Sequence, residues 1–204
     1  MGITLIDISK SFEDKKILDK VNFTFPENKV VGIFGASGCG KTTLTRIISG
    51  IEEADEGEVI GIENKKISYV FQEDRLIESI TALENVEAVC DDKNLCLNLL
   101  YQLELSEAIN KYPSQLSGGM RQRVSIARAM AFDGDIYILD EAFKGLDEGI
   151  KKKIMSLIKT KVSNKVCIFI SHDIDEINKL CDYVIYINEN PIKNFELKSI
   201  SEIL

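Results

Sequence analysis

The sequence lacks long hydrophobic runs and paired cysteines. Its longest apolar stretches, residues 166–170 and 183–187 among them, are five residues long, whereas a helix that crosses a bilayer needs about 20. We therefore expect no membrane-spanning segment. The five cysteines are odd in number and include no C-x-x-C pair, which argues against a disulfide framework, a zinc site or a redox pair. They are expected to be free thiols in a reducing compartment.

The sequence also has fewer basic than acidic residues and no segment with the composition of a flexible linker. The chain has 25 Lys and Arg against 33 Asp and Glu, and its net charge of -8 repels nucleic-acid phosphates and anionic membrane surfaces. We therefore expect no nucleic-acid partner. With three prolines, no Gly/Ser-rich tract and no internal repeat, no flexible linker is predicted. Residues 1–7 show no secretory signal pattern, so the expected compartment is the cytoplasm.

What is present is an ordinary globular balance, with 45% hydrophobic and 28% charged residues in 204. Short β-branched and aromatic runs alternate with amphipathic stretches, which predicts an α/β fold with a largely parallel core sheet. A polar turn at residues 13–16 joins the first two expected strands. The expected strands are residues 3–8, 17–25, 29–34, 67–71, 136–139, 166–170 and 183–187.

The middle of the chain has a different hydrophobic period. Leu95, Leu99, Leu100 and Leu103 recur at helical spacing, and no convincing strand interrupts residues 83–130. We therefore expect residues 74–133 to form a helical subdomain. It is inserted in an α/β core of residues 1–73 and 134–204, so that residues 1–204 form a single domain.

The clearest motif follows the expected strand 29–34. It matches G-x-x-x-x-G-K-[ST] in a strand-loop-helix context, which is typical of phosphate-binding loops. Glycines allow backbone amides to surround the phosphates, Lys41 can reach the β- and γ-phosphates, and the Thr42 hydroxyl can bind Mg²⁺. The motif consists of Gly35, Ala36, Ser37, Gly38, Cys39, Gly40, Lys41, Thr42 and Thr43.

Two carboxylates follow the apolar strand 136–139. Asp140 and Glu141 would lie at the carboxyl end of this strand, where a parallel sheet forms its ligand crevice. Asp140 is suited to hold Mg²⁺, and Glu141 to orient and polarise an attacking water. A purely structural role at the end of a strand is the alternative.

The single histidine, His172, follows the strand 166–170 and precedes a helix opened by Asp173, with Glu176 in capping-box register. Its place at a strand end favours contact with a γ-phosphate over a passive turn position. A further anion site is predicted at Ser117, Gly118 and Gly119, because they begin an amphipathic helix that Ser117 would cap; an ordinary helix start is the alternative. The buried face of this helix should include Val124, Ala127 and Met130.

The segment LSGGMRQR, together with the phosphate-binding loop and the ILDE strand, resembles the nucleotide-binding subunits of ABC transporters over nearly the whole chain. This resemblance implies a P-loop NTPase (RecA-like) core with a mixed, mainly parallel sheet, an N-terminal antiparallel β part and the helical insertion. The family motifs occur in order. They are Walker A at 35–43, the Q-loop at Gln72, the signature at 116–122, Walker B at 136–140, the catalytic Glu141, the D-loop at 145–147 and the switch His172.

The resemblance also implies a mechanism and partners. Two chains, identical or paired with a related subunit, would enclose two ATP molecules with Mg²⁺, each lying between the P-loop of one chain and Ser117–Gly119 of the other. Gln72 would contact Mg²⁺ or the water and report γ-phosphate occupancy, and Phe12 would stack on adenine, although a core aromatic is an alternative for Phe12. The family's partners are separate transmembrane permease subunits and, for importers, an extracytoplasmic solute-binding protein. The chain would then be peripheral on the inner face of the membrane.

Residues 70–76 and 81–86, together with LSGGMRQR, are similar to the corresponding segments in importers of nitrate, sulfonate, taurine and related small solutes. Three departures stand out: residues 77–79 replace a usual Pro-Trp pair, Ala142 replaces a proline, and Lys144-Gly145 changes the D-loop. Two other functions stay open, namely a soluble ABC-type ATPase in cofactor assembly and a nucleotide-gated module that has lost hydrolysis. From the short tail after residue 187 we expect no C-terminal regulatory domain.

Overall fold

The computed structural model describes residues 2–202, which form two compact units. The first unit contains residues up to 67, 135–138 and those from 162 onward, and the second contains residues 68–134 and 139–161. No helix among the described residues is long and apolar enough to cross a membrane.

The first unit begins with an antiparallel sheet of three strands, which lie in the order β2-β1-β4. They are β1 (Ile3–Phe12), β2 (Lys15–Phe25) and β4 (Glu56–Ile60). The expected turn at 13–16 is tighter than predicted, because β1 reaches Phe12 and β2 starts at Lys15, with Glu13 in the left-handed region at φ 51°. Residues 9–12, which lie outside the expected strands, and residues 15–16, which were expected in the turn, therefore belong to the hairpin strands.

Strand β4 was not expected from the sequence. Its residues EGEVI are exposed or half-buried, so the strand lacks the apolar alternation that predicts a sheet. It pairs with β1 beside a register shift between Ile6 and Ser9. Gly57 permits this pairing, because a Cβ there would lie 2.3 Å from the carbonyl oxygen of Ile6.

The second sheet has six strands in the order β5-β6-β7-β3-β8-β9. Strand β3 pairs in parallel with β7 and β8, and β8 pairs antiparallel with β9. All five residues of β6 and of β7 are buried, as expected of strands that are covered on both faces. The strands are β3 (Val30–Gly35), β5 (Ile67–Val70), β6 (Ile136–Asp140), β7 (Val166–Ile170), β8 (Tyr183–Ile187) and β9 (Leu197–Ser199).

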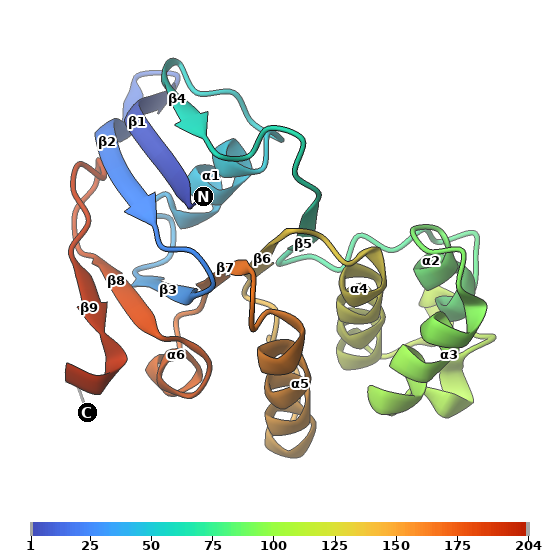
Figure 1. Ribbon diagram of the computed structural model, residues 1–204. Helices are drawn as coiled ribbons and strands as arrows, with labels where there is room; N and C mark the ends of the chain where they lie inside the picture. Colours follow the sequence, from blue (N-terminus) through green and yellow to red (C-terminus); the bar gives the residue numbers. More distant parts are fainter. Residues whose placement is uncertain (1, 203–204) are drawn as a thin grey trace. The chain divides into compact units, whose positions relative to one another are not determined.

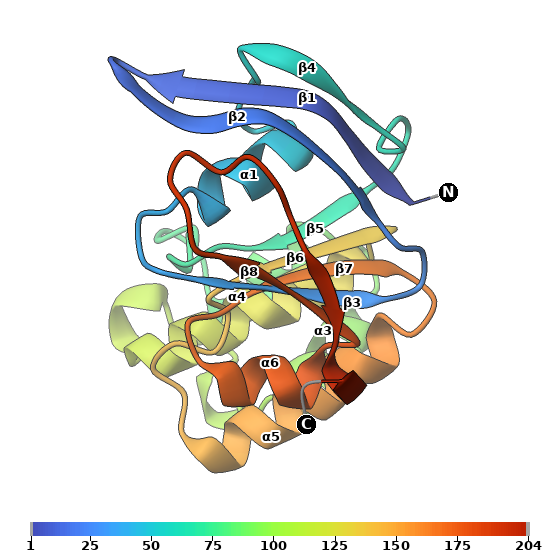
Figure 2. The ribbon, with the colours of Figure 1, turned by 90° about the vertical axis from the view of Figure 1, so that its left-hand side faces the viewer.

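These two sheets confirm the α/β fold with a mixed sheet and an N-terminal antiparallel part. In the first unit, helix α1 (Lys41–Ile48) lies between the three-stranded sheet and strands β3 and β8 (Figure 1, Figure 2). Its Leu44 and Ile48 are fully buried. Helix α6 (Ile174–Leu180) follows β7, and a short 3-10 turn (Ile200–Glu202) ends the described chain. Strand β9, which follows a polar segment, was also missed.

The second unit contains helices α2 (Ala82–Glu87), α3 (Lys93–Gln102), α4 (Gly118–Phe132) and α5 (Glu148–Lys161). Helix α4 packs against α2 and α3 (Figure 1). Leu99, Leu100 and Leu103 are buried, as their spacing predicts. Between residues 74 and 133 every regular element of the described chain is helical, including 3-10 turns at Ser106–Ala108 and Pro113–Gln115.

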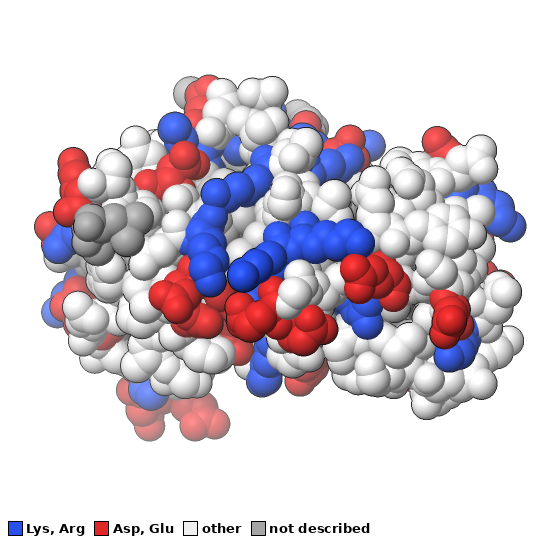
Figure 3. Space-filling model, turned by 90° about the horizontal axis from the view of Figure 1, so that it is seen from below, with Lys and Arg blue, Asp and Glu red and all other residues white. Residues whose placement is uncertain are grey.

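Charges of both signs are interspersed on the surface that Figure 3 presents. Within the second unit, three lysines of α5 form ion pairs: Lys151 with Glu148, Lys153 with Glu104 and Lys161 with Asp133. Exposed pairs of this kind add little to stability, typically below about 1 kcal/mol. They do reduce the local positive field of the lysine-rich helix.

Candidate functional site

The phosphate-binding loop of the first unit leaves strand β3 at Gly35 and enters α1 at Lys41. Gly38 and Gly40 have φ values of 75° and 112°, which side chains rarely adopt. A Cβ on Gly38 would meet open space, whereas one on Gly40 would lie 2.7 Å from Cγ2 of Ile17. The two glycines therefore have different roles: Gly38 keeps one side of the loop bare, and Gly40 lets the loop pack on β2.

Lys41 folds over this loop. Its Nζ donates to the carbonyl oxygens of Gly35 and Ala36, both at 2.8 Å, and lies 3.9 Å from Sγ of Cys39. The lysine is 6% exposed, so its ammonium is held at the loop rather than in solvent. The N-cap of α1 is Gly40, which supplies no capping side chain. A helix start of this type favours an anion such as a phosphate.

His172 lies at the same edge of the sheet as the loop. Strands β3 and β7 are parallel neighbours, and the amide of Ser171 donates to the Ile33 carbonyl at 3.4 Å. The residues after both strands therefore follow adjacent carboxyl ends, the usual ligand edge of such a sheet. The expected position of His172, just past the end of a strand, is confirmed.

The support of His172 differs from the predicted capping box. Asp173 caps α6 through Asp175, but Glu176 does not complete the box. Its carboxylate instead accepts the Ser171 hydroxyl at 2.6 Å, and Ser171 Oγ accepts from the Asp173 amide at 3.0 Å. Ser171 and Glu176 are both buried, so these bonds fix the backbone on either side of His172. The sequence did not indicate that Glu176 would be buried and bonded to Ser171 at the end of β7.

Phe12, the last residue of β1, is 46% exposed, and Nζ of Lys10 lies 5.3 Å from its ring centroid. This exposure disfavours the core-aromatic alternative, because a core ring would be covered. The ring is available for stacking with a flat ligand.

In the second unit, Asp140 ends strand β6 and is 2% exposed. The Tyr69 hydroxyl, on β5, contacts its Oδ2 at 3.4 Å. The ring of Tyr69 stacks on Phe71 with centroids 4.2 Å apart. Tyr69 is a contact that motif reading missed, because tyrosine in a strand normally indicates packing alone.

Gln72 and Glu141 are brought together. Nε2 of Gln72 donates to Oε2 of Glu141 at 3.1 Å, although the residues are 69 positions apart. Glu141 has a positive φ of 47°, a conformation that is uncommon for a residue other than glycine. The next residue, Ala142, is fully buried, and its carbonyl accepts from the Gln122 amide at 3.0 Å. Gln122 therefore supports the position where the family has proline, which the sequence did not indicate.

The signature segment begins helix α4. Ser117 caps this helix by accepting from the Met120 amide at 3.3 Å, as predicted. A Cβ on Gly118 would meet open space, whereas one on Gly119 would lie 3.0 Å from the Gly145 carbonyl oxygen. Val124, Ala127 and Met130 are buried, so the expected inner face is confirmed. Gly118 thus leaves the helix start bare on one side, and Gly119 allows the loop at Gly145 to approach.

A family model described as "ABC transporter" matches residues 18–144 of this chain. The chain is similar to the sulfate/thiosulfate import ATP-binding protein CysA of Burkholderia mallei (strain ATCC 23344), at 33% identity over 218 residues that cover 95% of this chain and 62% of the relative. It thus spans less than two thirds of that relative's length. The probable sulfate/thiosulfate import ATP-binding protein CysA of Chlorella vulgaris is 32% identical over 212 residues, covering 94% of this chain and 89% of the relative.

Solved structures give the same result. The dimeric post-hydrolysis state of the ATP-binding cassette MJ0796 bound to ADP and Pi superposes with a TM-score of 0.88 at 30% identity, covering 97% of this chain and 98% of that chain. The dimeric structure of MJ0796, described as a bacterial ABC transporter cassette, has a TM-score of 0.87 at 31% identity, with the same coverage.

Proposed function

Because this chain belongs to the ABC transporter family and carries its ATP-binding domain, we propose that it hydrolyses ATP to power solute transport through separate membrane subunits. The observation that carries the proposal is the pairing of Glu141 with Gln72, directly after the buried Asp140. A buried strand that delivers two carboxylates, one of them held by an amide side chain, is suited to phosphoryl transfer.

The residues have separate roles in this proposal. The amides of the loop 35–43 and the ammonium of Lys41 bind the phosphates, and His172 donates a hydrogen bond to the γ-phosphate. Glu141 accepts a proton from the attacking water while Gln72 orients that water. The adenine stacks on Phe12. Ser117, Gly118 and Gly119 bind the γ-phosphate of the nucleotide held by a second subunit.

The donor atoms present also fit Mg²⁺, which prefers a few oxygen ligands together with nucleotide phosphates. The Thr42 hydroxyl, the Asp140 carboxylate and the Gln72 amide oxygen would hold it. When bound, the ion neutralises charge on the β- and γ-phosphates. Tyr69 contacts Oδ2 of Asp140 and so restricts the orientation of that carboxylate.

We also propose the working assembly. Two such subunits enclose two ATP molecules, as the dimeric cassettes of similar fold suggest, and lie on the inner face of the membrane beside a permease. The relatives named as sulfate/thiosulfate import proteins support import. The motif wording at residues 70–76 and 81–86 favours a nitrate, sulfonate or taurine type of solute, delivered by an extracytoplasmic binding protein.

The test is recovery of a tagged Glu141→Gln protein from its native cells in ATP, with the unmutated tagged protein as control and copurifying proteins identified by mass spectrometry. A multi-span membrane protein retained in mild detergent supports transport, and a copurifying solute-binding protein narrows the solute. Recovery of soluble partners alone, as a cofactor-assembly ATPase would give, contradicts the proposal.

The shared site makes a second test possible. Since each site needs two chains, turnover of the isolated protein should rise faster than linearly with its concentration. Strictly linear turnover from a verified monomer would contradict the shared site.

A further inference from the structure

The segment after Gln72 is fastened to helix α4 by Arg121, which lies within the signature segment 116–122 but has no role assigned to it by that motif. Nε and Nη2 of Arg121 donate to the two carboxylate oxygens of Asp74 at 2.9 and 3.0 Å. The same guanidinium donates to both oxygens of Glu78, at 2.6 and 3.4 Å. A guanidinium that holds carboxylates in pairs fixes orientation as well as distance.

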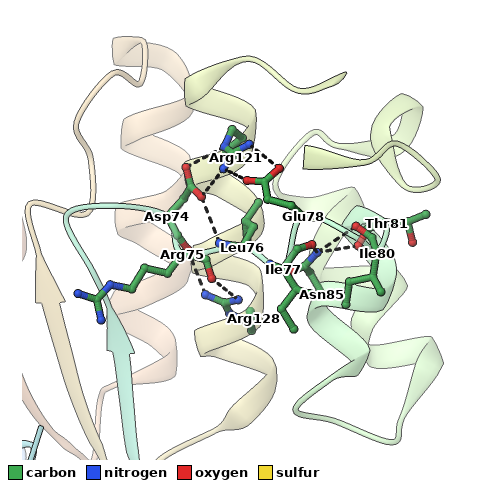
Figure 4. Close-up of polar contacts among 10 residues, drawn as sticks. All are labelled: Asp74, Arg75, Leu76, Ile77, Glu78, Ile80, Thr81, Asn85, Arg121 and Arg128. Carbon is green, nitrogen blue, oxygen red and sulfur yellow. Dashed lines mark hydrogen bonds and ion pairs between the residues drawn. The ribbon is translucent and has the colours of Figure 1, made fainter. Parts of the chain in front are cut away.

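A second arginine on α4 repeats the attachment. Arg128 donates to the backbone carbonyls of Asp74 at 3.1 Å and of Arg75 at 3.0 Å. Arg121 and Arg128 are seven residues apart, which places them on the same face of the helix about 10 Å apart along its axis. Figure 4 shows both side chains reaching the 74–78 segment from α4.

The other end of the segment is tied to helix α2. The fully buried Asn85 accepts from the Ile77 amide at 2.8 Å and donates to the carbonyls of Ile77, Ile80 and Thr81 (Figure 4). Residues 74–81 are thus held at several points and form a strap rather than a loose loop.

The Asp74 contact is the better protected of the two. The side chains of Arg121 and Asp74 are 24% and 22% exposed, whereas that of Glu78 is 59% exposed. Partial burial by itself would raise the pKa of Asp74, but the hydrogen bonds from Arg121 and from the Leu76 amide outweigh it, and the pKa of Asp74 is lowered. A lowered pKa keeps the contact at all pH values above the ordinary carboxyl range. It is lost only as pH falls through the lowered value, so it cannot shape a pH profile near neutrality.

The two ends of this attachment matter for the chemistry. Arg121 lies one turn after Ser117, with its amide bonded to the Ser117 carbonyl at 2.9 Å. Asp74 lies two residues after Gln72, whose side chain holds Glu141. Arg121 therefore links two parts of the second unit that contact different nucleotides in the proposed dimer.

We infer that Arg121 is a positioning residue, which through Asp74 keeps Gln72 and the Ser117–Gly119 helix start in one fixed register. The inference rests on the proposed function. A shift of Gln72 when ATP binds would then move the helix start that receives the partner's ATP. The contact contributes to assembly and turnover but not to binding of ATP at the subunit's own loop.

The experiment is a double-mutant cycle of Asp74→Asn and Arg121→Gln, with Glu78→Gln as the matched control. ATP-driven dimerisation is measured by analytical ultracentrifugation in the Glu141→Gln protein, and kcat is measured in the active protein. Loss of a charge-assisted bidentate contact should weaken dimerisation and lower kcat by about tenfold in each single variant. The double variant should lose no more than either single one, and Glu78→Gln should stay within about twofold of the parent.

The affinity of the monomer for ATP, measured by calorimetry, should change by less than about twofold in every variant, because it does not depend on the contact of Arg121 with Asp74. The inference is overturned if the losses of the two single variants multiply in the double variant, or if dimerisation is unchanged in the single variants. It is also overturned if the affinity of the monomer for ATP falls in parallel, because that would indicate general unfolding. Failure of the proposed function gives a different result: the parent Glu141→Gln protein would not dimerise with ATP, and wild type would not hydrolyse ATP.

Discussion

The two positive-φ glycines of the phosphate-binding loop should respond differently to replacement by alanine. Gly40→Ala places a Cβ 2.7 Å from Cγ2 of Ile17, which is itself buried, in a backbone conformation at φ 112° that alanine resists. Backbone strain of about 1–3 kcal/mol and overpacking of a similar size together predict a loss of about 2–6 kcal/mol. Gly38→Ala meets open space at φ 75°, so only the left-handed conformation is penalised, at about 1–2 kcal/mol.

The expected consequence is a separation of stability from binding. Urea unfolding followed by far-ultraviolet circular dichroism should show a midpoint lowered by about 1–3 M for Gly40→Ala and by less than about 1 M for Gly38→Ala, given a denaturant slope of about 2–3 kcal/mol per M. Gly38→Ala should nevertheless weaken ATP binding by about tenfold or more, because its Cβ enters the open side of the loop. Equal midpoints for the two variants, or unimpaired ATP binding by Gly38→Ala, would refute this reasoning.

Three further predictions concern the interior. Asn85→Ala removes the hydrogen-bond partner of four backbone groups and should lower the free energy of unfolding by about 2–4 kcal/mol, measured by urea unfolding. The control Asn98→Ala, at an exposed position, should have almost no effect. Equal effects of the two variants would contradict this prediction. Burial, with Cys90 beside it, raises the pKa of Cys96, so at pH 8 iodoacetamide should label Cys96 much more slowly than an ordinary exposed thiol. Early labelling of Cys96, found by peptide mapping, would count against this environment. Gln122→Leu removes the bond to the Ala142 carbonyl and should lower kcat by about tenfold with KM for ATP unchanged; an unchanged kcat would show that Glu141 does not depend on this support.

The sequence predicted most of the first unit, because its strands are apolar runs and its ligand loop has a strict pattern. Val166–Ile170 and Tyr183–Ile187 occur with the predicted bounds. Strand β4 was missed because EGEVI lies exposed at a sheet edge, where neither burial nor alternation is required. Its pairing depends on Gly57 and on a bulge in β1, which are properties of two distant segments together.

The candidate site shows the same limit. Lys41, Asp140, Glu141 and His172 could be chosen because each follows a recognisable strand. The contacts that hold such residues could not be predicted, because Gln72 and Glu141 are 69 positions apart in the sequence and Arg121 and Asp74 are 47 positions apart. Nothing local in a sequence reports such pairs. The Glu176 carboxylate illustrates a wrong inference from local spacing, because the Ser171 hydroxyl takes the bond that a capping box would have used.

The central claim is that this chain hydrolyses ATP with Glu141 as the base. Its most direct test is the ATP turnover of Glu141→Gln against wild type at saturating ATP and Mg²⁺, under conditions where both proteins bind ATP equally. The account predicts that turnover falls by at least about 100-fold, while ATP binding persists and a stable ATP-bound dimer accumulates. Turnover equal to that of wild type would contradict it, because the carboxylate held by Gln72 would then take no part in the reaction.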